Sequence, residues 1–427
     1  MRTRVYSHTV LVMGAVQLIE SLAFAIPLSY FPNYAIGLGA SVASVGLFTS
    51  SFMLASAIMS PRMGALSDRY GRKKILMFGI SGDVLIGILT GLAPSWYWLL
   101  VIRVMNGVVS SAAMLSGEAL LMDSVSPDHR GEASGFTTSM GMIGRNIGPA
   151  FGGTIQWFSH SQGLNLIDSY RIPYFVDSAL AVFALLLVLW SIREERPQGQ
   201  RQARTRASSP TTEGKVPIPT SFKVLLVTVF INGMGVGFII PISVLFYTDK
   251  FGIEPVEIGL IFTVSGFVGL LASWLAGLLS DRIGRKPLIG VGNFVSRFSG
   301  FALPLTNTVE QAAMVMTIRS LGFNVSMPSL RALRADIAPA EARGRFFGMF
   351  MTAFNVGSII GPIVSTYLYD IYRFRSIQIA DLALPGYGIP FFVNSVLGIV
   401  STIILLLWVE DPSHHQVERR GPEENSA

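Results

Sequence analysis

The chain has no cysteine among its 427 residues, which excludes disulfides, thiol catalysis and thiolate metal sites. Its five histidines show no metal-ligand spacing, so we expect no metal site and no cofactor. There is no GxxxxGK[ST] phosphate loop, which leaves direct drive by ATP unsupported. With no evident nucleophile, base or metal cluster either, we expect no catalytic residues and no enzyme activity.

Charge is also scarce. Only 14% of the residues are charged, against about 25% in typical soluble domains, whereas 51% are hydrophobic. Apolar runs of about 20 residues are long enough to cross a bilayer as helices. The sequence therefore predicts an all-α polytopic membrane protein with twelve spans, near 8–30, 42–62, 74–93, 97–121, 133–157, 172–191, 221–246, 256–277, 287–306, 309–331, 343–369 and 387–409.

The basic residues are unevenly distributed over the predicted loops. Loops 31–41, 94–96 and 304–309 contain no lysine or arginine. The alternate loops hold Arg62, Arg69, Arg72, Lys73, Lys74, Arg130, Arg282, Arg285, Lys286, Arg343 and Arg345, and the exceptions to this pattern are Arg171, Lys250, Arg373 and Arg375. Because basic loops stay in the cytoplasm, we expect a protein of the cell membrane with both termini on the cytoplasmic side. The net charge of +6 is then used for topology and lipid headgroups, and no nucleic-acid partner is expected.

A polar break divides the chain. Residues 192–220 are basic and rich in serine and proline, a composition that cannot bury enough apolar surface to fold. This predicts a cytoplasmic linker between an N-terminal six-helix bundle (1–191) and a C-terminal one (221–410), followed by a cytoplasmic tail (411–427).

The two halves repeat one another. GALSDRYGRKK at 64–74 matches GLLSDRIGRKP at 277–287, 213 positions apart (277 minus 64). Further landmarks recur at nearly the same offset: 123–131 with 336–344, 148–149 with 361–362, 171–178 with 388–395, and Arg103 with Arg319. Ordered landmarks at a nearly constant offset indicate an internal duplication, and parallel six-helix repeats are a known transporter architecture.

The duplicated loop resembles the signature loop of the major facilitator superfamily, and this similarity extends over essentially the whole chain. The resemblance implies a latch that joins the halves on the cytoplasmic side in the outward-facing state. Alternatively, the cluster only marks topology and turn geometry. The candidate latch residues are Gly64, Asp68, Arg69, Gly71, Arg72, Asp123, Arg130, Gly277, Asp281, Arg282, Gly284, Arg285, Asp336 and Arg343.

The stretch GMIGRNIGPAFGG at 141–153 resembles the fifth-helix motif of the drug–proton antiporter branch. Small residues let helices touch backbone to backbone and proline bends a helix, so the resemblance implies a seal between the halves at the outer end. Generic glycine packing is the alternative. The motif residues are Gly144, Gly148, Pro149, Gly152 and Gly153. Arg145 departs from the pattern: it could neutralise Glu118 or Asp83, or hold an anionic substrate group.

Charged residues inside a span are costly and are candidates for function. Glu20 lies near the middle of the first span and has no acidic counterpart in the second half, which suggests a proton or cation site. A carboxylate that only forms hydrogen bonds is the alternative. Arg103 resembles the family's fourth-helix arginine, which implies a role in proton coupling; a structural bridge is the alternative.

The remaining candidates are predicted to line a substrate cavity. Asp83 and Arg297 occupy equivalent repeat positions and form either a pair across the halves or two separate groups. Asp177 is expected at the membrane interface. The segment INGMGVGFIIP at 231–241 predicts a hinge or, alternatively, close packing. The candidate cavity residues are Gln17, Phe24, Asp83, Glu118, Arg145, Asn232 and Arg297.

Together these features predict a secondary active transporter that works by alternating access. The resemblance implies proton-coupled export of lipophilic small molecules or drugs, with the proton gradient as drive. Uptake of a small anionic or polar solute by proton symport is the alternative, favoured by the arginines. A channel fits the duplicated loops less well, and a sensor would need an output domain. The expected partners are lipids, protons and a small-molecule substrate, and we expect a monomer.

Overall fold

A computed structural model describes residues 7–192, 220–337, 343–379 and 382–409. The predicted linker, apart from its end residues 192 and 220, and the predicted tail lie outside the described residues. The structure is almost wholly helical, as the composition predicts.

Each half of the described chain contains six long helices. The first half has α1 (His8–Ala25), α3 (Val42–Tyr70), α4 (Arg72–Gly91), α5 (Trp96–Asp123), α6 (Arg130–Ser161) and α7 (Leu166–Ser191). The second half has α9 (Thr220–Phe251), α10 (Pro255–Ile283), α11 (Arg285–Ala302), α12 (Val309–Ile337), α13 (Arg343–Tyr372) and α14 (Ile389–Trp408). The shorter described elements are η1 (Ile26–Ser29), α2 (Phe31–Gly37), η2 (Pro127–His129), η3 (Leu303–Leu305), β1 (Ser376–Ile379), β2 (Leu382–Pro385) and η5 (Gly386–Gly388).

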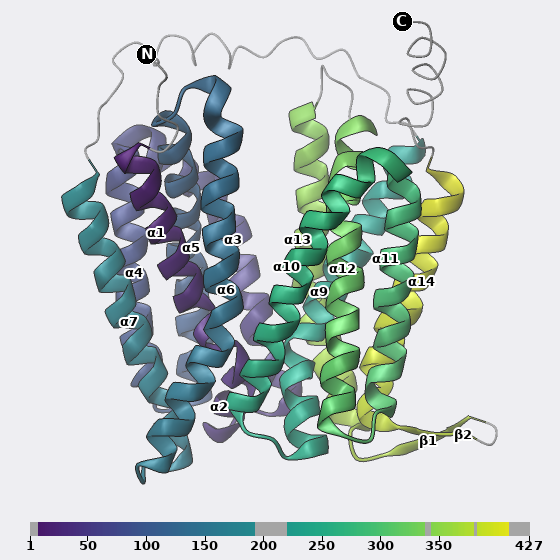
Figure 1. Ribbon diagram of the computed structural model, residues 1–427. Coiled ribbons are helices and arrows are strands. Elements are labelled where there is room, and N and C mark those ends of the chain that lie inside the picture. Colours follow the sequence, from purple (N-terminus) through teal and green to yellow (C-terminus); the bar gives the residue numbers. More distant parts are fainter. Residues whose placement is uncertain (1–6, 193–219, 338–342, 380–381, 410–427) are drawn as a thin grey trace, which may run out of the picture.

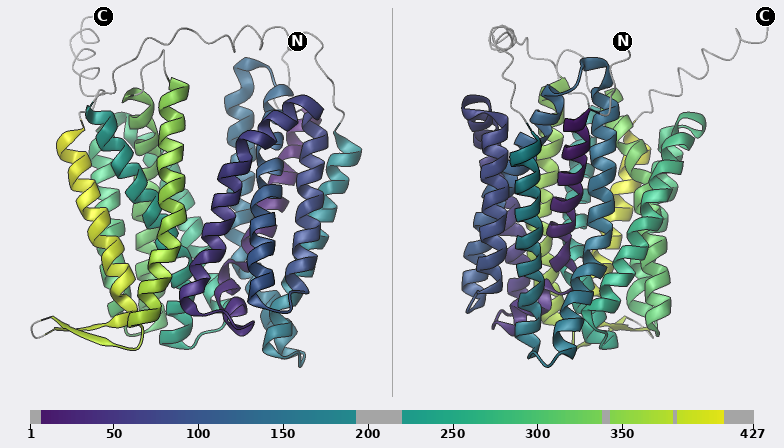
Figure 2. Two further views of the ribbon diagram at one scale, coloured as in Figure 1. Left: turned by 180° about the vertical axis from the view of Figure 1, so that it is seen from behind. Right: turned by 60° about the vertical axis from the view of Figure 1, so that its left-hand side comes forward.

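The long helices form two bundles that stand side by side (Figure 1). We call the end where α1 begins and α14 ends the terminal end, and the opposite end the far end. The bundles lie apart at the terminal end and approach one another toward the far end, as the view from behind also shows (Figure 2). This confirms the prediction of an all-α polytopic membrane protein with twelve helices in two six-helix bundles.

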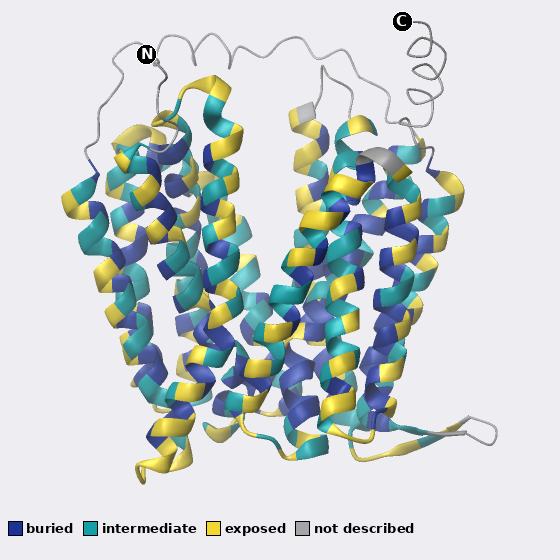
Figure 3. Ribbon diagram, viewed as in Figure 1, coloured by how far each residue is buried: buried dark blue, intermediate teal, exposed yellow. Residues whose placement is uncertain are grey.

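Much of the outer surface of the two bundles is apolar. Ten helices of the described chain are long and apolar enough to cross a membrane; α6 and α12 are as long as the rest but are not among these ten. Large apolar side chains remain exposed on the outside, with Trp190 82% and Leu407 70% exposed (Figure 3). A soluble protein rarely exposes so much contiguous apolar surface, so these faces are suited to lipid contact.

Local sequence signals explain several helix ends. Ser41 and Asn165 cap α3 and α7, because their side chains accept hydrogen bonds from the backbone N–H groups of Ser44 and Asp168. The two loops of the repeat each turn on a glycine with positive φ, at Gly71 (φ 111°) and Gly284 (φ 91°). Few other residues tolerate this conformation, so these glycines separate α3 from α4 and α10 from α11.

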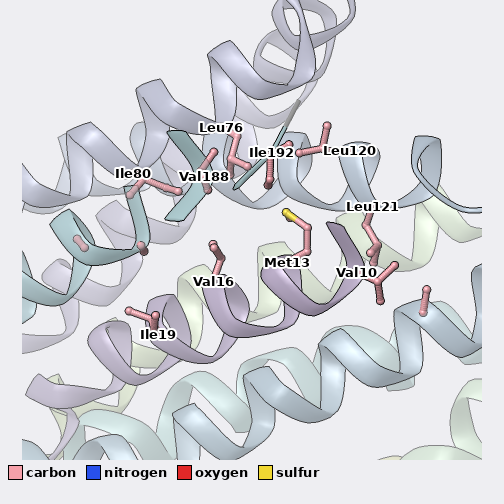
Figure 4. Packing of buried hydrophobic residues seen from close by; sticks show 13 residues of the cluster. Val10, Met13, Val16, Ile19, Leu76, Ile80, Leu120, Leu121, Val188 and Ile192 are labelled. Atoms are coloured by element: carbon pink, nitrogen blue, oxygen red, sulfur yellow. The ribbon is translucent and has the colours of Figure 1, made fainter. Parts of the chain in front are cut away.

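Within the first bundle, one apolar stripe of α1 is buried against α4, α5 and α7. Val10, Met13, Val16 and Ile19 follow helical spacing and face α4, α5 and α7, where they meet residues such as Leu76 (Figure 4). Burial of this stripe fixes which face of α1 is inside the bundle. As a result the rotation of Glu20, one residue beyond Ile19, is also set.

At the far end the bundles touch through two equivalent glycine contacts. A Cβ at Gly46 of α3 would overlap the carbonyl oxygen of Pro362 in α13, and a Cβ at Gly259 of α10 would overlap that of Pro149 in α6. Each member of one contact lies 213 positions from its counterpart in the other (259 minus 46, 362 minus 149). The far-end interface therefore has the pseudo-symmetry of the repeat, and glycine permits the close approach.

Polar bonds reinforce this interface. Ser50 Oγ donates to the carbonyl oxygen of Ile359 at 2.5 Å, and Asn33 Nδ2 donates to Thr248 Oγ1 at 3.0 Å. Both bonds join the two bundles. The far end also carries an antiparallel hairpin in which Ser376 pairs with Pro385, a feature the sequence did not predict because its strands are only four residues long.

Candidate functional site

A cavity of about 380 Å³ lies between the bundles, adjacent to the far-end contacts. Residues of α1, α2, α3, α5 and α6 line it from one side, and residues of α9 to α12 from the other. Six phenylalanines contribute to the wall, which we call the aromatic wall: Phe24, Phe31, Phe48, Phe52, Phe262 and Phe323. Its volume is within the range of small-molecule sites, about 300–1,000 Å³.

Four arginines and no acidic residue belong to the lining of this cavity. They are Arg103 on α5, Arg145 on α6, Arg297 on α11 and Arg319 on α12. Of these, Arg145 and Arg297 were predicted cavity residues. Arg319 was known only as the repeat counterpart of Arg103, and that equivalence was the signal that could have identified it.

Arg297 is held deep in the second bundle and is only 5% exposed. Its Nη2 donates to Asn232 Oδ1 at 3.1 Å and its Nη1 to Asn394 Oδ1 at 3.3 Å, while its Nε is buried without a hydrogen-bond partner among the described residues. A Cβ at Gly398 would overlap the guanidinium, and one at Gly235 would lie 3.1 Å from Nη1. Glycine at these two positions makes room for the arginine.

Arg103 faces an aromatic and acidic environment in the first bundle. Its guanidinium lies 4.0 Å from the centre of the Phe31 ring on α2, a favourable cation–π distance. Tyr174 and Asp177 of α7 are close enough to interact with it electrostatically. Arg103 therefore connects the interior of the first bundle to α2, whose Asn33 contributes to the far-end interface.

Glu20, Asp83 and Asp177 form a group of three acidic residues inside the first bundle. Electrostatic interactions join Glu20 to both aspartates, and Glu20 Oε1 is buried without a hydrogen-bond partner in the described part of the chain. Asp177 lies beside α4, since a Cβ at Gly87 would be 3.3 Å from Asp177 Oδ2. The expectation that Asp177 is interfacial is wrong: it lies mid-helix in α7, and packing against α4 turns it inward.

The other predicted cavity residues occupy different places. Gln17 Nε2 donates to Ser21 Oγ at 3.1 Å on α1, and Asn232 accepts a hydrogen bond from Arg297.

Glu118 is exposed on α5. The Arg145 guanidinium lies 5.6 Å from the centre of the Phe24 ring, and Arg145 pairs with neither Glu118 nor Asp83 among the described residues. Asp83 and Arg297 are two separate groups, one in each bundle. Of the predicted set, the structure places Phe24, Arg145 and Arg297 in the lining.

The predicted latch residues lie at the terminal end. Arg72 bridges Asp68 at 2.5 Å and Asp123 at 3.1 Å, and the equivalent Arg285 pairs with Asp336. Arg130 Nε donates to the carbonyl oxygen of Met122 at 3.2 Å. These contacts stay within one bundle.

Glycines 64 and 277 in the predicted latch have no atom within 4 Å of an added Cβ, and Gly64 lies in the last turns of α3, the helix whose first turns form the far-end contact. Arg69 lies 5.3 Å from the Tyr70 ring. The side chains of Asp281, Arg282 and Arg343 lie outside the described residues.

The glycine motif of α6 packs on α1 and η1. Added Cβ atoms at Gly144, Gly148 and Gly152 would meet the backbone of Leu18, Leu22 and Ile26. Gly153 instead meets Pro255 of the second bundle. In α9, Gly233 and Gly237 pack against α13, so the structure supports close packing as the reason for these glycines.

Comparison with known proteins agrees with this architecture. The family model of the Major Facilitator Superfamily matches residues 13–224 and again residues 225–426. "Multidrug resistance protein 2" of Bacillus subtilis (strain 168) is 25% identical over 335 residues, covering 78% of this chain and 81% of its own length. "Multidrug resistance protein MdtG" of Enterobacter lignolyticus (strain SCF1) is 26% identical over 365 residues, covering 83% of this chain and 84% of its own.

Solved structures share the fold. A bacterial homolog of the human lysosomal transporter Spinster, in an inward-facing and occupied conformation, superposes with a TM-score of 0.74 at 15% identity and covers 98% of both chains. The xylose transporter XylE from E. coli, in an inward-open conformation, gives 0.71 at 15% identity and covers 94% of this chain and 96% of its own. With the family model matching both halves, the chain belongs to the Major Facilitator Superfamily and is a multi-pass membrane transporter.

Proposed function

We propose that this transporter exports lipophilic small molecules from the cytoplasm in exchange for protons. The observation that carries the proposal is the acidic group of Glu20, Asp83 and Asp177, which lies in the first bundle beside a cavity with an aromatic wall. The relatives named multidrug resistance proteins support the export of such molecules.

The acidic group is suited to proton exchange because its members repel one another. Three carboxylates close together inside a bundle cannot all stay charged cheaply, so at least one readily takes up a proton. Glu20 is the main proton carrier in this proposal, since one of its oxygens is buried without a partner among the described residues.

Arg103 would couple the proton to the conformation. Asp177 attracts its guanidinium electrostatically, and the Phe31 ring of α2 lies against the same guanidinium. Protonation within the acidic group weakens the attraction to Asp177 and changes how Arg103 holds α2. Because Asn33 of α2 bonds to Thr248 of the second bundle, the change reaches the far-end contacts.

In the predicted orientation the far end faces outward, so the structure corresponds to a cavity open to the cytoplasm. The terminal-end cluster around Arg72 and Arg285 would then join the halves in the opposite state. The empty space beside Gly64 and Gly277 supports this, because close helix approach there would need the absence of a side chain.

The decisive experiment uses proteoliposomes with an imposed pH gradient and two radiolabelled probes, 4-(1-naphthyl)butyrate and 4-(1-naphthyl)butylamine. Some transporter molecules will insert with the terminal end on the outside of the vesicle. In vesicles with an acidic lumen, these molecules should carry the probe into the lumen in exchange for protons that leave it. Protein-free vesicles correct for passive trapping of weak acids and bases. Glu20→Gln should abolish this accumulation but retain binding, whereas Glu132→Gln, an exposed acid on α6, should not change it.

Proton-coupled uptake of an anionic or polar solute is the second candidate, favoured by the four cavity arginines. In the same vesicles, accumulation that requires protons to enter together with the probe would establish symport and contradict export. Normal pumping by Glu20→Gln would remove Glu20 as the carrier.

A further inference from the structure

We propose that the cavity selects lipophilic anions, holding the anionic group at Arg297 and Arg319 and the apolar body against the aromatic wall. The inference rests on the proposed function only in taking this cavity as the transport site. It names the chemical class of the substrate, and it does not depend on the direction of transport or on the coupling ion.

The first argument is the charge of the wall. Every ionisable side chain of the lining is an arginine, and neither aspartate nor glutamate contributes. A lipophilic cation would enter a cavity in which Arg145, Arg297 and Arg319 repel it. An anion would be attracted by the same groups, and the low dielectric of an aromatic cavity strengthens that attraction.

The second argument is that the cations of the second bundle lack a counter-charge. Arg297 is bonded only to the neutral amides of Asn232 and Asn394, and its Nε is buried without a partner among the described residues. Arg319 lies near enough to Arg297 for the two charges to repel. No ion pair within 4.0 Å is formed by either arginine in the described part of the chain.

Buried charges are normally paired, because an unpaired one costs several kcal/mol. The two neighbouring guanidinium groups that face this cavity therefore lack the counter-charge that buried arginines normally have. An anionic ligand group would complete them, and the planar donor fork of arginine suits a carboxylate, sulfonate or phosphate oxygen pair.

Arg103 does not share this role, because Asp177 already interacts with it. The acidic group thus stays associated with the first bundle, and the anion site belongs to the second. Phe24, Phe31, Phe48 and Phe52 stand on the first-bundle side of the cavity, so the apolar body of the ligand would lie toward them. The ligand is then amphipathic, with its head at one bundle and its body at the other.

The test is equilibrium binding to the purified full-length protein in phosphatidylcholine nanodiscs, with empty nanodiscs subtracted. The probes are 4-(1-naphthyl)butyrate, 4-(1-naphthyl)butylamine and 4-(1-naphthyl)butanol, which share one apolar body. We expect the carboxylate to bind at least about tenfold more tightly than the amine, a difference of ~1.4 kcal/mol. Equal or tighter binding of the amine would overturn the proposal.

Variants locate the site. Arg319→Gln and Arg297→Gln should each weaken carboxylate binding about tenfold and leave butanol binding unchanged, whereas Arg297→Lys should keep the preference for the anion. Arg375→Gln, an exposed arginine of the far-end loop, is the matched control. If Arg297→Gln fails to fold, Arg319→Gln alone decides. Uniform loss for all three probes in well-folded Arg319→Gln would contradict the assignment.

An anionic lipid offers the same chemistry as a free amphiphile. Repeating the binding in discs that contain phosphatidylglycerol separates the two sources. Weaker binding of the neutral butanol probe, which the anionic membrane surface does not repel, identifies membrane lipid as an occupant of the anion site, and unchanged butanol binding identifies the free amphiphile; either result supports the site. Because no gradient is present, failure here is distinct from failure of the proton-exchange experiment.

Discussion

The two bundles share one fold but place opposite chemistry at equivalent positions. Asp83 of α4 corresponds to Arg297 of α11 (297 minus 83 is 214), and Asp177 of α7 corresponds to Asn394 of α14 (394 minus 177 is 217). In the first bundle these positions carry two members of the acidic group. In the second they carry the buried arginine and one of the amides that bond to it.

This difference shows how a duplicated transporter can divide its tasks. The packing glycines and the terminal-end ion pairs recur in both halves, because both halves must pack and switch in the same way. The polar positions at cavity depth do not recur, and we infer that they were free to specialise, one for protons and one for an anion.

The largest effect is expected from making the first bundle resemble the second. Asp177→Asn introduces the residue found at Asn394 and removes the charge that attracts Arg103. Gradient-driven transport of 4-(1-naphthyl)butyrate should fall at least about tenfold, and binding of the same probe should change less than about threefold. Proteoliposome flux and nanodisc binding measure the two quantities. Equal loss of both would mean that Asp177 serves the binding site itself.

The reciprocal change, Asn394→Asp, should affect the second bundle instead. It places a carboxylate where an amide oxygen now lies 3.3 Å from Arg297 Nη1, and so neutralises the proposed anion site internally. Carboxylate binding should weaken about tenfold, or ~1.4 kcal/mol, while binding of the neutral alcohol persists. Unchanged carboxylate affinity would show that Arg297 does not hold the ligand.

Two glycines of one helix should shift the conformational equilibrium in opposite directions. Gly46→Leu fills the contact with Pro362 and should disfavour far-end closure, whereas Gly64→Leu fills the terminal end and should disfavour closure there. The absence of cysteine allows clean spin-label pairs, one across each end, for distance measurement. A several-fold population change is expected, since two conformations of a protein that interconverts between them typically differ by only a few kcal/mol. Shifts of the same sign would contradict the assignment of the two ends.

The smallest effect is expected from the duplicated ion pairs. Arg72→Ala and Arg285→Ala remove equivalent partners of Asp123 and Asp336, which are both partly exposed. Each variant should lose less than ~1 kcal/mol of stability, because solvent screens such pairs. Thermal unfolding in detergent should show similar small shifts for the two variants. A large loss for one alone would break the symmetry of the terminal end.

Much of the architecture was predictable from the residues. The twelve apolar runs, the duplicated loops and the glycine–proline landmarks gave the helix number and the bundle division. The predicted seventh-span hinge is less well supported, because glycines that weaken a helix in isolation here fit against α13. Sequence spacing cannot separate these two uses of glycine, since both favour the absence of a side chain.

The charged residues show the limit of such reasoning. Helical periodicity in the sequence determines which residues share a face of one helix, and Glu20 was identified in this way. Only the tertiary structure decided that Glu20 lies within electrostatic range of Asp83 and Asp177, and that Arg297 bonds to two amides instead of an acid. Each of these contacts joins different helices, and it depends on how whole helix faces pack against one another, which no local pattern encodes.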